Sequence, residues 1–231
     1  MKQKNISMIG AGKMAAILSR YFAIAGHSVH IGTRDTEKAA QLALEIGCGV
    51  HSGSIEKAVQ QGDIVFLAVP YLQIPQALEH AGSLSGKIVV DISNPLNADY
   101  SGLLPGMDIS GAEELAKVLP DAKVVKAFNC IYATVLEGGP EYGSGSGSGD
   151  EEGGGQPDGN MRAQVFYAGD DEQAKQVVAE LIEDTGFVPI NTGGLMSARY
   201  QENLTALILQ VDKHLKEPMQ IASAMLMRES L

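Results

Sequence analysis

The sequence predicts an α/β fold of Rossmann type, with a doubly wound, mainly parallel sheet and a small helical extension at the C-terminus. The chain begins with a short apolar strand, a glycine-rich turn and a long helical pattern, which is the order that opens such folds. Further apolar runs then alternate with helical patterns. With 231 residues, of which 45% are hydrophobic, the chain is long enough to bury a full core.

The first predicted strand, residues 5–9, leads into a glycine-rich turn and then a helix. Gly10 permits the tight turn, Gly12 lets the backbone approach a pyrophosphate, and Ala15 is small enough for the helix to pack closely on the strand. The free N–H groups at the start of the helix favour a phosphate. The alternative is a purely structural glycine turn. We predict a dinucleotide cradle whose contacts are Gly10, Ala11, Gly12, Lys13 and Met14.

The end of the second predicted strand indicates which dinucleotide binds. It reads Ile31-Gly32-Thr33-Arg34, with Lys38 one helical turn further on. An NAD site usually places an acidic residue here, whereas a 2′-phosphate needs donors and positive charge. The first acid, Asp35, comes one position late, and a guanidinium can fork onto phosphate oxygens. We predict NADP rather than NAD; the alternative is that Arg34 and Lys38 form a solvated face. Asp35 is expected to cap the following helix in either case.

Three later apolar runs, residues 63–69, 87–92 and 123–128, are predicted to be buried parallel strands, with helices such as residues 110–119 between them. Ligands of doubly wound sheets bind beyond the carboxyl ends of the strands. Prolines there fix the backbone, and the two asparagines can hold a nicotinamide carboxamide or a polar substrate group. An ordinary turn and a loop cap are the alternatives for these asparagines. The strand-end residues are Ala68, Val69, Pro70, Asn94, Pro95, Ala127, Phe128 and Asn129.

The sequence divides into an NADP-binding Rossmann domain, residues 1–138, an insertion, residues 139–160, and an extension, residues 161–231, that completes the sheet and caps the site. The insertion is rich in Gly and Ser and has no apolar anchors, which favours a flexible surface loop over a substrate lid. The extension predicts strands at 163–168 and 187–190 and a helix at 171–185. It ends with a Met-rich segment, a candidate partner surface, after an apolar helical stripe expected to pack on the core: Leu204, Leu207, Ile208, Val211 and Leu215.

Composition limits the functional class. The formal net charge of −11 argues against a nucleic-acid or anionic-membrane surface, and nothing resembles a signal peptide or a membrane span. Cys48 and Cys130 lie far apart, without the spacing of a zinc site or a redox dithiol, so free thiols in the cytoplasm are expected. Cys130 is expected to be a buried structural residue. No metal site is predicted.

The motifs taken in order, continuing with Gly193-Gly194-Leu195-Met196-Ser197-Ala198-Arg199 and Glu202-Asn203-Leu204, resemble the NADP oxidoreductases that use the deazaflavin coenzyme F-420. They are also similar to the cytosolic oxidoreductase domain of the STEAP metalloreductases. The resemblance covers nearly the whole chain apart from residues near 140–160. It implies that Thr33, Arg34 and Lys38 take the 2′-phosphate and that Val69, Pro70 and Ala127 line the nicotinamide end. It further implies that the Gly194-Leu195 turn helps to shape the pocket of a second redox partner, coenzyme F-420, FAD or FMN.

The sequence assigns no catalytic acid or base. The five histidines do not supply a convincing proton donor, and transfer between two redox rings needs orientation more than acid catalysis. Tyr71 and Tyr132 follow strand ends, so an NADPH-dependent reductase of a small carbonyl, imine or quinone stays open. A non-catalytic NADP(H)-binding regulatory protein is the third class. A homodimer is expected.

Overall fold

The structure is a computed structural model that describes residues 2–104, 106, 108–142, 161–216 and 219–225. The first half contains β1 (Asn5–Ile9), α1 (Lys13–Ile24), β2 (Ser28–Gly32), α2 (Thr36–Ile46), β3 (His51–Gly53), α3 (Ile55–Gln61), β4 (Ile64–Leu67), the 3-10 turn η1 (Tyr71–Gln73), α4 (Ile74–Glu79) and β5 (Ile88–Asp91). The second half contains α5 (Gly111–Val118), β6 (Lys123–Ala127), α6 (Ala133–Gly138), β7 (Glu141–Tyr142), β8 (Met161–Arg162), β9 (Gln164–Gly169), α7 (Glu172–Asp184), β10 (Val188–Asn191), the 3-10 turn η2 (Leu195–Ser197) and α8 (Ala198–Asp212).

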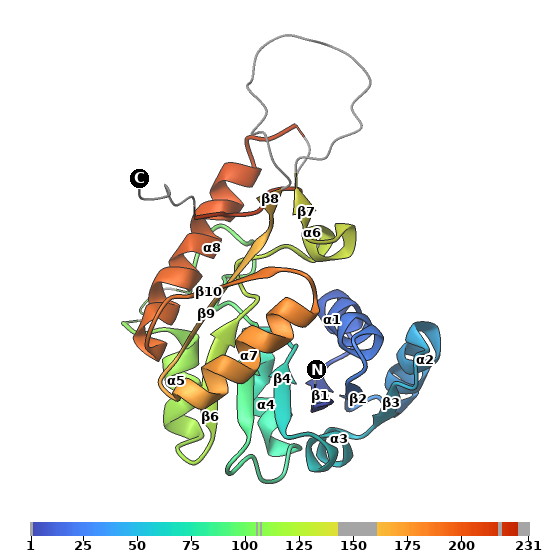
Figure 1. The fold of residues 1–231 in the computed structure, drawn as a ribbon. Helices are drawn as coiled ribbons and strands as arrows, with labels where there is room; N and C mark the ends of the chain where they lie inside the picture. Colours follow the sequence, from blue (N-terminus) through green and yellow to red (C-terminus); the bar gives the residue numbers. More distant parts are fainter. Residues whose placement is uncertain (1, 105, 107, 143–160, 217–218, 226–231) are drawn as a thin grey trace, which may run out of the picture.

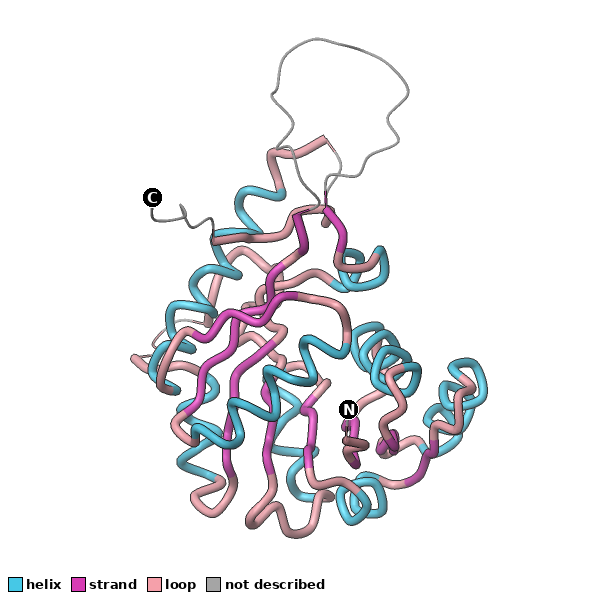
Figure 2. Tube along the Cα trace, in the orientation of Figure 1, coloured by secondary structure: helices cyan, strands magenta, loops and turns pink. Residues whose placement is uncertain are grey.

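The central sheet has eight strands in the order β10-β9-β6-β5-β4-β1-β2-β3. The strands from β6 to β3 are parallel, and the order reverses beside β1, so the predicted doubly wound sheet is confirmed. Figure 1 shows α2 and β3 at one end of the sheet and α8 at the other. Figure 2 shows the strands as a central layer between helices.

The central strands are mainly apolar because helices cover both faces of the sheet. On one face α1 and α7 pack on Met8, Phe66 and Val125. On the other face α3, α4 and α5 pack on Val65, Leu67 and neighbouring residues. This packing leaves the carboxyl edge of the parallel strands as the place where loops and side chains can surround a ligand.

The strand that follows the insertion reverses direction. β9 pairs antiparallel with β6, so that Ala127 lies opposite Tyr167, and β10 runs parallel to β9. The carboxyl ends of β9 and β10 therefore lie at the amino edge of the parallel strands, where Lys123 at the start of β6 pairs with Asp171 at 3.1 Å. The turn that follows β10 lies at this edge as well.

Helix α8 returns along the sheet toward the carboxyl edge and is held by two charged contacts. Arg199 donates two hydrogen bonds to Glu113 of α5, at 2.8 and 2.7 Å, and these bonds hold the pKa of Glu113 at about 2. Glu202 accepts from the N–H of Gly111 at the start of α5, at 3.0 Å. These contacts fix one end of α8 to the edge of the domain.

The expectation that the whole apolar stripe of α8 packs on the core is wrong. Ile208 is buried and Leu204 is half-buried, but Leu207 is 58% exposed and Val211 and Leu215 are also exposed. The residues that do face the protein lie on a different side of the helix, which includes Thr205 and Asp212. The buried face of α8 is turned about a quarter of the helix circumference away from the centre of the stripe, so only one edge of the stripe, at Ile208, reaches the core.

Three further predictions concern the cap of α2, the insertion and membrane-spanning helices. Asp35 caps α2 as expected, since its carboxylate accepts from the N–H of Lys38 at 3.1 Å. Most of the insertion, residues 143–160, lies outside the described residues, so the expected flexible loop stays a prediction. In the part of the chain that the structure covers, no helix is both long and apolar enough to cross a membrane.

Candidate functional site

A cavity of about 660 Å³ opens at the carboxyl ends of β1, β2 and β4; we call it the dinucleotide cavity. It brings together most of the residues that the sequence assigns to the cofactor. Gln73 and Ala77, from η1 and α4, complete a wall that the sequence analysis did not predict. The lining residues are Ile9, Gly10, Ala11, Gly12, Gly32, Thr33, Arg34, Asp35, Lys38, Ile55, Ala68, Val69, Pro70, Gln73 and Ala77.

The start of α1 faces this cavity with unpaired backbone donors. Gly12 is the N-cap and makes no side-chain capping bond, and the first turn holds no acidic residue. A Cβ on Gly12 would have no heavy atom within 4 Å, so the space over the turn is open. Open space, free N–H groups and the positive end of a helix dipole suit a pyrophosphate.

Two alanine substitutions separate the structural glycine from the binding one. Gly10 has φ +123°, and a Cβ there would lie 2.3 Å from the carbonyl oxygen of Ala68. We expect Gly10→Ala to lower the free energy of unfolding by about 2 kcal/mol or more, because backbone must move. Gly12→Ala should leave that free energy within about 0.5 kcal/mol but abolish the thermal stabilisation by NADP⁺. Thermal unfolding with and without NADP⁺ measures both effects; normal cofactor stabilisation of Gly12→Ala would contradict the cradle.

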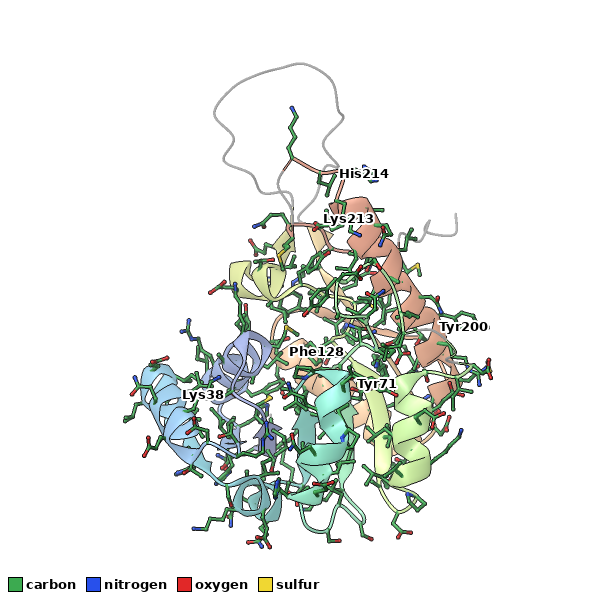
Figure 3. The ribbon with its side chains drawn as sticks, turned by 180° about the vertical axis from the view of Figure 1, so that it is seen from behind. Lys38, Tyr71, Phe128, Tyr200, Lys213 and His214 are labelled. Carbon is green, nitrogen blue, oxygen red and sulfur yellow. The ribbon has the colours of Figure 1, made fainter. Side chains whose placement is uncertain are left out.

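The cationic end of the dinucleotide cavity lies beyond β2. Arg34 and Lys38 are exposed on its wall, and the Arg34 guanidinium donates to Gln76 Oε1 of α4. The Thr33 hydroxyl donates to the carbonyl oxygen of Asp35, so it supports the turn. Figure 3 shows Lys38 on α2, to the side of the sheet. Two cations that share a wall, with Arg34 held by a residue of α4, suit a 2′-phosphate.

A second cavity, of about 550 Å³, opens at the carboxyl ends of β5 and β6, and we call it the apolar cavity. Apolar side chains form most of its wall, and α8 forms one side. Phe128, near the centre of Figure 3, lies between the sheet and α8. The lining residues are Met14, Ile92, Asn94, Leu96, Tyr100, Phe128, Asn129, Cys130, Ile131, Tyr132, Ala133, Thr205, Ile208, Leu209, Asp212 and Met219.

A smaller cavity of about 340 Å³, the bridging cavity, lies between the other two. Val69 and Pro70 line both this cavity and the dinucleotide cavity. Asn94, Leu96 and Tyr100 line both this cavity and the apolar cavity. The three cavities are therefore neighbours along the carboxyl edge of the sheet.

The two predicted asparagines meet beside these cavities. Asn94 Nδ2 donates to the carbonyl oxygen of Asn129 at 2.8 Å, and Asn129 Nδ2 donates to Asn94 Oδ1 at 3.0 Å. Phe128, between β6 and Asn129, is buried and has φ +59°, a conformation that is rare for a bulky residue. Such strain is found where a site fixes the backbone. Phe128 thereby turns the chain so that Asn129 reaches Asn94.

A buried charged network lies under this strand end. Lys126 Nζ donates to Asp91 at 2.8 Å, to Glu202 at 2.8 Å and to the carbonyl oxygen of Ser93 at 2.7 Å. All three charged side chains are almost completely buried. The network connects β5, β6 and α8, and it fixes the residue that precedes Asn94. The sequence analysis placed Asp91 and Lys126 within predicted strands and Glu202 in a motif of the resemblance, but it assigned these residues no role.

The candidate acids and the thiol of the site have raised pKa values. Burial, with the nearby Asp212 carboxylate, raises the pKa of Tyr132 to about 12. Burial also raises the pKa of Tyr71, and neighbouring carboxylates add to this. Burial raises the pKa of the Cys130 thiol to about 11, so Cys130 is a buried, unreactive residue as expected. None of the three is tuned for proton transfer or nucleophilic attack near neutral pH.

Four predicted site residues do not line the two large cavities as expected. Lys13 is exposed and pairs with Glu137 at 2.8 Å. Ala127 is completely buried. Gly194 and Leu195 lie at the opposite, amino edge of the sheet, where Leu195 accompanies Lys123 and Asp170 on the wall of a separate cavity. The reversal of β9 puts the Gly194-Leu195 turn there, so we no longer include that turn in the acceptor pocket.

The sequence analysis missed the contribution of α8 to the site. Thr205, Ile208, Leu209 and Asp212 lie at positions i, i+3, i+4 and i+7, which share one helical face. The signal available in the sequence was that polar residues, Thr205 and Asp212, lie at the two ends of a helical face whose middle is apolar. Among the described residues, no group of three or more His, Cys, Asp or Glu side chains is placed to hold a metal ion.

Comparison with known proteins agrees with the site. Residues 5–95 match the family model described as NADP oxidoreductase coenzyme F420-dependent. The F420-dependent NADP reductase of Methanothermobacter marburgensis is 29% identical over 219 residues, which cover 88% of this chain and 89% of that protein. A solved structure from Arthrobacter sp. FB24, assigned as an F420-dependent NADP reductase, has a TM-score of 0.77 and 27% identity, covering 95% of this chain and 100% of that one. The predicted resemblance and fold are confirmed.

A second group of relatives is longer than this chain. The metalloreductase STEAP3 of Rattus norvegicus is 32% identical over 204 residues, which are 88% of this chain and 37% of that protein. The chain therefore spans just over a third of the length of this relative. Both groups of relatives are named as reductases, in agreement with the class that the sequence predicts.

Proposed function

We propose that this chain is an NADP-dependent oxidoreductase that transfers a hydride between NADP(H) and a flat redox ring of the deazaflavin or flavin type. The observation that carries the proposal is that three neighbouring cavities, which share lining residues, lie along the carboxyl edge of the sheet. One end supplies a glycine turn and two cations, and the other end supplies a mostly apolar chamber. The volume of that chamber lies within the range of about 300–1,000 Å³ that is usual for small-molecule sites.

The residues of the dinucleotide cavity would hold NADP(H) in a defined direction. Gly10, Gly12 and the start of α1 would hold the pyrophosphate, and Arg34 and Lys38 would hold the 2′-phosphate. Val69 and Pro70 then direct the nicotinamide end toward the bridging cavity. When bound, NADPH supplies the hydride, while the protein supplies orientation.

The residues of the apolar cavity would hold the second ring and exclude water from it. Leu96, Phe128 and Ile208 provide apolar walls, and the paired Asn94 and Asn129 provide fixed polar atoms between the two rings. A reaction between two oriented rings gains most from such positioning. The raised pKa of Tyr132 also disfavours it as a general acid at neutral pH, which weighs against the carbonyl reductase alternative.

Stopped-flow absorbance of NADPH tests the proposal with three acceptors: the deazaflavin coenzyme F-420, FMN and FAD. We expect rapid oxidation of NADPH by at least one of them and much slower oxidation of NADH. No oxidation with any of the three would refute the proposal. Tight NADPH binding without turnover would instead favour a regulatory NADP(H)-binding protein.

A further inference from the structure

Most buried polar side chains of the apolar cavity use their hydrogen-bond donors within the protein; the exception is Tyr132, whose hydroxyl has no hydrogen-bond partner among the described residues. The side-chain amide of Asn94 donates to the carbonyl oxygen of Asn129, and the side-chain amide of Asn129 donates to Asn94 Oδ1. The Thr205 hydroxyl has the carbonyl oxygens of Asn129 and Gln201 within reach, at 3.1 and 3.2 Å. The Cys130 thiol donates to the carbonyl oxygen of Gln201 at 3.1 Å. A ligand in the cavity therefore meets few free donors.

One buried acceptor is left without a donor. Asn129 is 5% exposed, and its Oδ1 has no hydrogen-bond partner among the described residues. The amide cannot be reversed to remove this defect, because its oxygen would then face Asn94 Oδ1. A buried acceptor without a donor is costly, so a ligand N–H that reaches it gains affinity.

A carboxylate lies at the other end of the α8 wall. Asp212 is 9% exposed and forms no ion pair with Lys or Arg in the part of the chain that the structure describes. One of its oxygens accepts from the N–H of Met219 at 2.6 Å. Among the residues that the structure describes, no Lys, Arg or His lines the cavity. A carboxylate beside apolar walls attracts positive charge and repels negative charge, because little solvent screens it.

The helix sets the distance between these two polar ends. Thr205, which contacts Asn129, and Asp212 lie seven residues apart on one face of α8, about 10 Å along the helix axis. Apolar side chains such as Ile208 lie between them. The cavity thus has a long apolar middle with hydrogen-bond acceptors at both ends.

We infer that the apolar cavity selects an electron acceptor whose buried part is a ring with N–H donors and no negative charge, and that Asp212 determines this specificity. The inference rests on the proposed function, because it concerns the acceptor of the same hydride. The imide edge of a redox ring and a protonated cyclic imine both have this chemistry. Any phosphate or carboxylate of the acceptor stays outside the cavity.

Calorimetric binding of two matched probe pairs, with NADP⁺ present, tests the inference. Naphthylmethylammonium and naphthoate have similar size and opposite charge. Lumichrome and its N,N-dimethyl derivative differ in the ring N–H donors. We expect naphthylmethylammonium to bind at least about tenfold more tightly than naphthoate, and lumichrome about tenfold more tightly than its methylated form. Equal affinities within the charged pair would overturn the role of Asp212, and equal affinities within the lumichrome pair would overturn the N–H requirement.

One variant assigns the charge preference to Asp212. Asp212→Asn keeps an oxygen for the N–H of Met219 but removes the charge, and it should reduce the preference for the ammonium probe to about twofold. Glu45→Gln makes the same charge change on the exposed surface of α2 and should leave the preference intact. An unchanged preference in Asp212→Asn would refute the assignment.

The same proteins separate this inference from the proposed function. Titration with NADPH reports on the dinucleotide cavity alone. Absence of NADPH binding would refute the proposed function, and NADPH binding and oxidation with no preference between the probes would refute this inference only. The NADPH titration and the comparison of the two lumichrome probes are both measured on the unmodified protein. A variant that folds poorly therefore does not affect these results.

Discussion

Replacing Arg34 by Ala is expected to lower kcat/KM for NADPH by about 10- to 100-fold and to leave kcat/KM for NADH nearly unchanged. A hydrogen bond to a charged group is worth about 1.5–3 kcal/mol, and each 1.4 kcal/mol is about a tenfold change. Arg34 is exposed and its guanidinium is held by a hydrogen bond to Gln76 of α4, so it is already ordered on the wall of the dinucleotide cavity. NADH lacks that phosphate and should not lose this contact.

Arg20→Ala is the matched control for this prediction. Arg20 is an exposed arginine of α1 that does not line the dinucleotide cavity. Steady-state kinetics with both cofactors should show no selective loss of NADPH in the control. Equal losses for NADPH and NADH in Arg34→Ala would show that Arg34 does not read the 2′-phosphate, and the preference for NADP would then need another explanation.

The dinucleotide cavity could be predicted from the sequence because its determinants are local. Gly10, Gly12, Thr33 and Arg34 lie within or directly after two adjacent strands, and the register of β1 and β2 brings them together. The apolar runs also identify the parallel strands, because a strand buried on both faces must be apolar. The contribution of α4 was missed because nothing local indicates that Gln76 reaches across to Arg34.

The apolar cavity depends on contacts between distant segments, and the sequence shows these poorly. Whether β9 joins the sheet parallel or antiparallel is decided by its pairing with β6, and this pairing decides to which edge the Gly194-Leu195 turn goes. The backbone turn at Phe128 is equally hidden, since its sequence predicts ordinary strand. The side of α8 that faces the protein was misjudged because an apolar pattern alone does not distinguish a core face from an exposed one.

The buried network under the strand end makes the largest stability prediction. We expect Lys126→Met to lower the free energy of unfolding at pH 7 by about 3–5 kcal/mol, the cost of leaving buried charges unpaired. Asp91 and Glu202 would both lose their buried cation, and the carbonyl oxygen of Ser93 would lose its donor. Chemical denaturation measures the change. Lys175→Met is the control, because Lys175 pairs with the exposed Glu172 and should cost about 1 kcal/mol or less.

The pH dependence distinguishes lost charge pairing from lost packing. Burial alone would lower the pKa of Lys126, but Asp91 and Glu202 raise it above its ordinary value of 10.5. Its contribution to stability is therefore complete at pH 7 and is lost only as the pH rises through the raised pKa. The deficit of Lys126→Met relative to the unmodified protein should therefore shrink only in strongly alkaline solution, where the unmodified protein loses the charge of Lys126. If Lys126→Met does not fold at pH 7, the double variant Lys126→Met/Glu202→Gln provides the test. It buries one charge fewer and should recover part of the lost free energy of unfolding. A deficit that stays the same in strongly alkaline solution, together with no recovery in the double variant, would mean that Lys126 acts through packing and not through charge.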